Sequence, residues 1–484
     1  MKSVFLLFLA LLIAFVACKD FPAVAPVTNT KASFFYYLES CENGQVGVVF
    51  DASASQELLR YDWDFGDGSR LDTTAAVVRH VYKNAAPETF LVVLQAKYDE
   101  MNVDSLTKTI IIDPNATLKW TKTGDQLGLS PFFGRTNWVG ETPDGGVAAT
   151  GFVKVDANSW TPMQMFVVKL DALGKLVFSI LLSISGTSQS EGVAAIAEKD
   201  GSIIACGKAL DTDSQWHLAV WNINNIGVVV SSYLVPTADE VAVDIQKTVE
   251  GQYVAMVKQR GNSDLPKLYL FSNANFAAAS PTFQELSGNV ILERFVQDKG
   301  TNNNLEFVGA SRTKGSNPPH WDAADRMQLG RFNTTSAFDF IGAPVAPTRK
   351  FKEVKTVAAT ENAYWVGGKT DGTRGYLAKT DKSGGLLGEH PFTDADNIRS
   401  ITAVCALQNG GCLYAAIADV EARFVFGKVN DNVQLLGTPT LLMHNGQSDD
   451  GAYFCSETHC GNWLIGGTFE NKVMIVKTDK DGNL

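Results

Sequence analysis

The chain has 484 residues, which is enough for more than one domain. Its formal net charge is −11 and 19% of its residues are charged, so the composition argues against a nucleic acid as the partner. A hydrophobic content of 45% together with 42 glycines indicates a globular, turn-rich β protein rather than a disordered chain.

The amino-terminal residues have the pattern of a secretory signal. One basic residue, Lys2, precedes an apolar run from Val4 to Val16, which is shorter than the roughly 20 residues that a bilayer-spanning helix needs. The letters FVAC at 15–18 resemble the bacterial lipobox, in which a small residue precedes the cysteine that receives lipid. We therefore expect residues 1–17 to be a lipoprotein signal peptide and Cys18 to be lipidated. An ordinary signal peptide with an incidental Cys18 is the alternative.

Residues 18–31 hold two prolines and show no periodicity, so we expect them to be a lipidated tether. The letters KD at 19–20 also resemble the short export tag of surface lipoproteins in the Bacteroidetes. The expected location is the outer membrane, on its periplasmic face or at the cell surface.

Residues 32–113 contain short β-type runs separated by turns, which predict a sandwich. Alternation along its central strand places Tyr61, Trp63 and Phe65 on the core face. The letters WDFGDG at 63–68 resemble the signature of the PKD domain, an immunoglobulin-like sandwich. This resemblance implies a spacer or adhesion module without catalytic activity.

Two aspartates of this signature, Asp64 and Asp67, could be calcium ligands. The alternative, which we favour, is that their carboxylates pin the turn by accepting bonds from backbone N–H groups.

Residues 116–484 repeat a unit of four strands, with a glycine-rich second strand and a polar turn after the third strand. The turn residue is Asp or Asn in seven copies at intervals of 48 to 60 residues, namely Asp171, Asn224, Asn273, Asn333, Asp381, Asn430 and Asp479. Periods of this size with four strands predict propeller blades. The expected fold is therefore all-β, an immunoglobulin-like (PKD) sandwich followed by a seven-bladed β-propeller.

The seventh copy stops at Leu484 before its fourth strand, while an unassigned β-type segment, 118–123, precedes the first copy. We predict that this segment pairs into the last blade and closes the propeller, which leaves no exposed sheet edge.

Four cysteines suggest disulfides. Cys405 and Cys412 flank one predicted hairpin turn, and Cys455 and Cys460 flank the matching turn of the next copy. An exported protein meets conditions in which disulfides persist, so we predict a bridge within each pair. We expect no metal site and no cofactor.

No motif of a catalytic nucleophile, metal centre or phosphate loop is present, so we assign no catalytic residue. The loops between second and third strands are long at 154–164, 209–215 and 311–326, and they carry large aromatic residues. Aromatic side chains on polar loops can stack on sugars or anchor a protein partner. The candidate ligand-binding residues are Trp160, Trp216, His217, His320, Trp321 and Arg326. The alternative is that these tryptophans cover the seams between blades.

The sequence favours a non-enzymatic, membrane-anchored envelope lipoprotein that recognises a glycan or a protein through the propeller face, with the PKD-type domain as spacer. Two alternatives stay open, a structural subunit of an envelope complex and a propeller polysaccharide hydrolase or lyase.

Overall fold

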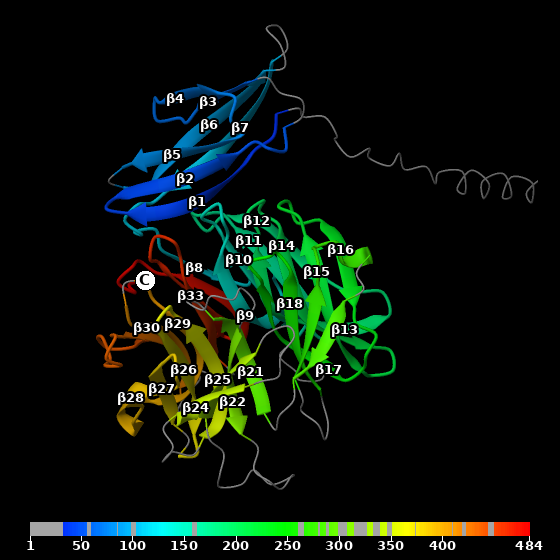
Figure 1. Ribbon diagram of the computed structural model, residues 1–484, viewed down its shortest axis with the longest axis vertical. Coiled ribbons are helices and arrows are strands. Elements are labelled where there is room, and N and C mark those ends of the chain that lie inside the picture. Colours follow the sequence, from blue (N-terminus) through cyan, green and yellow to red (C-terminus); the bar gives the residue numbers. More distant parts are fainter. Residues whose placement is uncertain are drawn as a thin grey trace, which may run out of the picture. The chain divides into compact units, whose positions relative to one another are not determined.

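A computed structural model describes most of the chain (Figure 1). The described residues are 32–484 without 56–59, 85, 98–102, 157–161, 260–265, 279–280, 287–289, 299–306, 314–326, 333–338, 346–350, 373, 409, 419–422 and 444–449. The predicted signal peptide, Cys18 and the tether lie outside them, as do Trp160, His320, Trp321 and Arg326. Within the described ranges, no helix has the length and apolar character needed to cross a membrane.

The structure is all-β and divides into two compact units. The first contains Phe50–His80 and Phe90–Ile110, with the described residues up to Phe35. The second contains Tyr36–Val49, Val81–Thr89 and Ile111–Leu484. Only two short 3₁₀ helices occur among the described residues, η1 (Phe276–Ala278) and η2 (Asp394–Asp396).

The strands that precede residue 113 form two sheets, one in the order β1-β2-β5 and one in the order β4-β3-β6-β7. Their bounds are β1 (Phe35–Glu42), β2 (Gln45–Asp51), β3 (Arg60–Asp64), β4 (Arg70–Thr73), β5 (Val77–Lys83), β6 (Glu88–Lys97) and β7 (Val103–Ile112).

The core of the first unit is built around Trp63 of β3, which is fully buried as its alternation with polar neighbours predicts. Its ring centroid lies 5.1 Å from that of Phe34 and 5.5 Å from that of Phe50. The next inward residue, Phe65, stacks on the His80 ring at 4.1 Å.

The two aspartates of the 63–68 signature hold the turn after β3. Asp64 accepts a bond from the Gly66 backbone N–H and Asp67 accepts one from that of Ser69, both at 3.0 Å. Asp67 also lies 2.7 Å from Nε2 of His80. Through these bonds both carboxylates stabilise the turn, as the sequence favours.

The second unit contains seven consecutive four-stranded antiparallel sheets in its described part, which we number sheets 1 to 7 (Figure 1). Sheets 1 to 3 consist of β9 (Phe133–Glu141), β10 (Val147–Lys154), β11 (Gln164–Leu170) and β12 (Leu176–Leu182); β13 (Thr187–Ala197), β14 (Ile203–Asp211), β15 (Trp216–Ile223) and β16 (Val229–Leu234); and β17 (Glu240–Lys247), β18 (Tyr253–Gln259), β19 (Pro266–Phe271) and β20 (Thr282–Glu285).

Sheets 4 to 6 consist of β21 (Val290–Gln297), β22 (Phe307–Thr313), β23 (Met327–Phe332) and β24 (Asp339–Val345); β25 (Phe351–Ala359), β26 (Ala363–Thr370), β27 (Gly375–Asp381) and β28 (Leu386–Pro391); and β29 (Ile398–Ala406), β30 (Cys412–Ala418), β31 (Arg423–Val429) and β32 (Thr440–Met443). Sheet 7 consists of β33 (Gly451–Glu457), β34 (Trp463–Phe469), β35 (Lys472–Lys477) and β8 (Trp120–Thr123).

The sheets pack as a ring of the β-propeller type. The first strand of each sheet, which we call the inner strand, contacts the inner strand of the next sheet, and β33 of sheet 7 contacts β9 of sheet 1. Every neighbouring pair of sheets shares a buried apolar cluster. The cluster between sheets 7 and 1 includes Leu464 and Ile475 from one side and Val139 and Val168 from the other.

The repeated Asp/Asn turn has the same bonding in all six copies that are described. The side-chain oxygen accepts a bond from the backbone N–H two residues later, in Asp171, Asn224, Asn273, Asp381, Asn430 and Asp479. The remaining predicted position, Asn333 of the fourth copy, lies outside the described residues. The repeat is therefore a repeat of turn chemistry, in which a short polar side chain replaces backbone hydrogen bonds.

The predicted pairing of 118–123 with the last sheet is present as strand β8. It runs antiparallel to β35, with Trp120 opposite Lys477 and Thr123 opposite Met474. The Trp120 ring packs against the apolar cluster of sheets 7 and 1, and its Nε1–H group donates to the Ala172 carbonyl at 3.4 Å. Gly174 lies against the face of this ring, where a Cβ atom would come within 2.8 Å of it.

Replacing Trp120 by alanine should therefore destabilise the second unit. We expect a loss of about 2–4 kcal/mol in the free energy of unfolding, since a large, partly buried ring leaves the cluster. Urea unfolding of the two proteins measures it. The control Thr121→Ala, an exposed position on the same strand, should stay within about 0.5 kcal/mol of the parent; an equal effect of both changes would contradict the packing role of Trp120.

The predicted pairing of cysteines is wrong. Cys460 forms a disulfide with Cys41, and both belong to the second unit. Cys206, Cys405, Cys412 and Cys455 keep thiol groups.

The reason lies in the register of the hairpins. In sheet 6, Cys405 is opposite Leu413 and Cys412 is opposite Ala406, so the two cysteines differ by one residue and point to opposite faces. Cys412 enters the cluster shared with sheet 5, while Cys405 packs against the cluster shared with sheet 7. In sheet 7, Cys455 lies in that same cluster, whereas Cys460 is in the turn that follows β33.

Thiol labelling of the unfolded but unreduced protein tests this pairing. Peptide mass mapping should find alkylating reagent on Cys405, Cys412 and Cys455 and none on Cys41 or Cys460 until a reductant is added. The observed pairing would be contradicted if Cys460 were labelled before reduction, or if neither Cys405 nor Cys412 were labelled.

Candidate ligand-binding cavity

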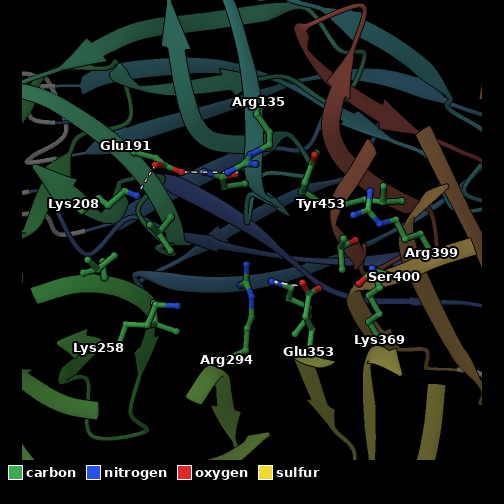
Figure 2. A pocket seen from close by; sticks show the side chains of 18 residues that line it. Arg135, Glu191, Lys208, Lys258, Arg294, Glu353, Lys369, Arg399, Ser400 and Tyr453 are labelled. Atoms are coloured by element: carbon green, nitrogen blue, oxygen red, sulfur yellow. Dashed lines mark hydrogen bonds and ion pairs between the residues drawn. The ribbon is translucent and has the colours of Figure 1, made fainter. Parts of the chain in front are cut away.

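A cavity of about 540 Å³ opens between the inner strands of the ring. Every one of sheets 1 to 7 supplies at least one lining side chain, from Arg135 in sheet 1 to Tyr453 in sheet 7 (Figure 2). Its volume falls in the range of about 300–1,000 Å³ that is usual for small-molecule sites.

Each inner strand has a β-bulge, and in six of the seven sheets the described side chain at this bulge lines the cavity. In sheet 1, Thr136 pairs with Gly151 and Trp138 with Thr150, so Asn137 is an extra residue without a partner across the strand pair. The same shift of register occurs in all seven sheets. Wherever the side chain of the extra residue is described, it lines the cavity, and these residues are Asn137, Val193, Val243, Lys355, Thr402 and Tyr453. Bulges commonly redirect side chains in this way beside functional sites.

A second group of lining residues comes from the carboxyl ends of the second strands. Lys208 pairs with Glu191, Lys258 with Val241 and Lys369 with Glu353, so the three lysines occupy equivalent positions of sheets 2, 3 and 5. Ile417 has the corresponding place in sheet 6, opposite Ser400.

The lining is strongly basic. Its described residues include seven cationic side chains, Arg135, Lys208, Lys258, Arg294, Lys355, Lys369 and Arg399, and two anionic ones, Glu191 and Glu353. Six of the seven sheets supply at least one of these cations.

Glu191 is an internal counter-ion on one side of the cavity (Figure 2). Its carboxylate lies 2.8 Å from Lys208 Nζ and 3.3 Å from Arg135 Nη2, and it accepts a bond from the Asn137 amide at 3.1 Å. Burial opposes the ionisation of Glu191, but Lys208 and Arg135 outweigh it and hold the pKa below its ordinary value. Glu191 is therefore an ionised, ion-paired group.

Two arginines are held by aromatic rings and a buried acid. The Arg135 guanidinium lies 4.5 Å from the Tyr453 ring centroid, and that of Arg294 lies 4.8 Å from the Phe454 ring centroid. Arg294 also lies 3.6 Å from the carboxylate of Asp244, which is almost completely buried. Burial raises the pKa of Asp244 to about 6, against the opposing effect of Arg294.

The structure brings one predicted ligand-binding residue near the cavity. Lys208 Nζ lies 4.8 Å above the Trp216 ring, so this tryptophan contacts a lining lysine at the edge of sheet 2. His217 is buried instead, with Nδ1 2.9 Å from the Val235 carbonyl and Nε2 2.9 Å from Asp211. These contacts hold the turn between β14 and β15 and leave His217 no access to a ligand. The expected loop 209–215 is shorter than predicted, because β14 continues to Asp211.

The remaining predicted ligand-binding residues, Trp160, His320, Trp321 and Arg326, lie outside the described residues. The basic lining itself was not predicted from the sequence. The sequence does contain one indication of it, because three copies of the repeat have a lysine near the end of the second strand, at 208, 258 and 369. Within the described part of the chain, no group of three or more His, Cys, Asp or Glu side chains is placed to bind a metal ion.

Comparisons with known proteins bear on the fold alone. No protein-family model matches the sequence, and no curated protein matches it. The solved structures that it resembles include the Dos1 propeller, with 11% identity over 72% of this chain and 94% of that one and a TM-score of 0.41. They also include the β-propeller domain of the Trilobed protease from Pyrococcus furiosus, with 8% identity over 71% and 93% of the two chains and a TM-score of 0.42.

A third similar structure is a glucose dehydrogenase, with 9% identity over 60% of this chain and 98% of that one and a TM-score of 0.37. These similarities assign no activity to this chain.

The buried Asp244 should make stability depend on pH. Its pKa in the folded protein, about 6, exceeds its ordinary value of 3.8, so the folded state retains this proton to a higher pH than the unfolded chain. Its contribution therefore favours folding more at pH 4 than at pH 7, by up to about 3 kcal/mol, and Asp244→Asn removes that contribution. Urea unfolding of parent and variant between pH 4 and 7 should show the parent losing stability relative to Asp244→Asn as the pH rises.

The matched control is Asp213→Asn, which removes an exposed carboxylate with the same charge. It should leave the difference from the parent nearly constant over that pH range. A constant difference for Asp244→Asn as well would contradict the effect of burial.

Proposed function

We propose that this chain is a membrane-anchored lipoprotein of the cell envelope, which recognises a ligand without catalysis at the central cavity of a seven-bladed β-propeller. Residues 32–113 would be a PKD-type spacer, and the lipid on Cys18 would attach the protein to the outer membrane. The anchor and the location follow from the sequence of residues 1–20.

Three observations support a propeller with seven blades. The second unit has seven successive four-stranded sheets in its described part, each inner strand contacts the next one around to the first, and β8 completes the last sheet. For the PKD-type spacer, the support is the buried aromatic group around Trp63 and the turn that Asp64 and Asp67 hold.

One observation carries the assignment of ligand recognition to the cavity. The cavity receives side chains from all seven sheets, and in the six sheets whose bulged side chain is described, the bulge directs that residue towards it. Such bulges interrupt the hydrogen bonding between paired strands and so lower the stability of the fold. A binding site that needs these side chains explains why the bulges recur.

Binding accounts for the acidic groups better than catalysis does. A hydrolase needs one carboxyl group that keeps its proton near neutral pH. Glu191 is ion-paired with Lys208 and Arg135, which lower its pKa, and Glu353 lies 3.7 Å from Lys355. The two acids described in the lining are thus counter-ions of its own cations, and Asp244, whose pKa is raised to about 6, is buried beside Arg294 and does not line the cavity.

A steric block of the cavity tests this function. Val193→Trp places a large ring at a bulged, cavity-lining position without changing the charge. We expect the parent protein to bind a subset of an array of glycans and purified envelope proteins, and we expect Val193→Trp to lose at least about tenfold in affinity for those ligands, because the ring fills the site.

The control is Val249→Trp, since Val249 is 62% exposed in the turn between β17 and β18. It should bind like the parent. Circular dichroism and thermal melting establish that each variant is folded, and Thr402→Trp at the equivalent bulge of sheet 6 replaces Val193→Trp if the latter fails to fold. Ligand binding that survives both blocks would disprove the cavity as the recognition site.

A further inference from the structure

The charge of the cavity is opposite to that of the whole chain. Among the described side chains of its lining, seven are cationic and two, those of Glu191 and Glu353, are anionic, in a protein with a formal net charge of −11. When the buried Asp244 beside Arg294 is counted as well, the described side chains still carry an excess of four positive charges around about 540 Å³. This basic character is therefore local and does not follow from composition.

The cations face the cavity from opposite sides. Figure 2 shows Arg135 and Lys208 on one side, with Arg294 and Arg399 on others, and their side chains point towards the enclosed space. Like charges that converge in one cavity repel each other, which lowers the stability of the protein unless an anion enters. A single negative charge would reach only part of this circle of cations.

The charge is balanced unevenly within the cavity. On the side of sheets 1 and 2, Glu191 neutralises much of the charge of Arg135 and Lys208. On the side of sheet 6, Arg399 forms no ion pair within the described ranges, and it is exposed at a second shift of register between Ile398 and Ser400.

Arg399 has neighbours that suit an oxyanion. Figure 2 shows the Ser400 side chain and the Lys369 ammonium on the same side of the cavity as the Arg399 guanidinium. A guanidinium presents a planar set of donors that matches two oxygens of a carboxylate, sulfate or phosphate group, and lysine adds a compact positive charge. The Ser400 hydroxyl donates to the Ile401 carbonyl at 3.5 Å, and its O–H can rotate to donate to a ligand oxygen instead.

We propose that the ligand of this cavity is a multivalent oxyanion, a small molecule or chain end with two or more carboxylate, sulfate or phosphate groups, one of them held by Arg399, Lys369 and Ser400. The inference rests on the proposed function, because it names the ligand class of the same cavity. A neutral glycan or the flat surface of a folded protein would leave Arg399 without a counter-ion.

Calorimetric titration of the full chain with four defined probes tests the proposal. The probes are an oligogalacturonate, a sulfated dextran oligosaccharide, inorganic tripolyphosphate and a neutral dextran oligosaccharide of equal length. We expect at least one of the anionic probes to bind, with an affinity that falls as NaCl rises from about 50 to about 500 mM, and we expect the neutral probe not to bind. Which anionic probe binds most tightly identifies the source of the oxyanion.

Variants of Arg399 locate the site. Arg399→Glu should weaken binding about 10- to 100-fold, because it removes an unpaired cation and adds a repelling charge, while Arg399→Lys should retain most of the affinity. Lys175→Glu makes the same change of charge at an exposed turn after β11, outside the cavity lining, and should stay within about twofold of the parent.

The outcomes separate this proposal from the function on which it rests. Neutral ligands that bind in the parent and are lost in Val193→Trp would leave the recognition function intact and overturn the oxyanion class. Anionic binding that Arg399→Glu and Lys175→Glu weaken equally would overturn the site, since a general surface effect explains it. Binding that Val193→Trp does not affect would overturn both.

Discussion

The closing contact of the ring, where strand β33 of sheet 7 lies against β9 of sheet 1, is the constraint on which the rest of the second unit depends. Around a closed ring, each inner strand must meet a neighbour on both faces, and the apolar residues of every sheet fill the space between them. Each inner strand also carries a bulge, and wherever the side chain of the bulged residue is described, it lines the cavity.

The electrostatic arrangement is also a consequence of the ring. The chain as a whole is net negative, while the described side chains that line the cavity are mostly cationic. Glu191 and Asp244 moderate this charge from within the fold. Burial raises the pKa of Asp244 against the effect of Arg294, whereas Lys208 and Arg135 outweigh burial and lower the pKa of Glu191. We expect a site of this kind to distinguish ligands first by their charge and only then by their shape.

The sequence predicted what local chemistry determines. The Asp/Asn turns, the buried face of Trp63 and the pairing of β8 with the last sheet all depend on patterns that can be read within a few residues or by counting copies. The sequence did not predict what depends on register between strands. A bulge such as that at Asn137 has no local signature, and the opposite directions of Cys405 and Cys412 follow from a difference of one residue in pairing. The partner of Cys460 lies 419 residues away, so no local spacing could indicate it.

The origin of β8 constrains the order of events during biosynthesis. This strand emerges with Trp120, but the other three strands of its sheet begin only at Gly451, so sheet 7 stays incomplete until residues up to Lys477 have been made. Until then, the apolar residues of sheet 1 that pack on sheet 7 have nothing to cover them, and the chain must be shielded from aggregation and proteolysis. A product that ends prematurely anywhere before Lys472 would lack the edge to which β8 pairs, which offers the cell a direct way to distinguish complete from truncated molecules.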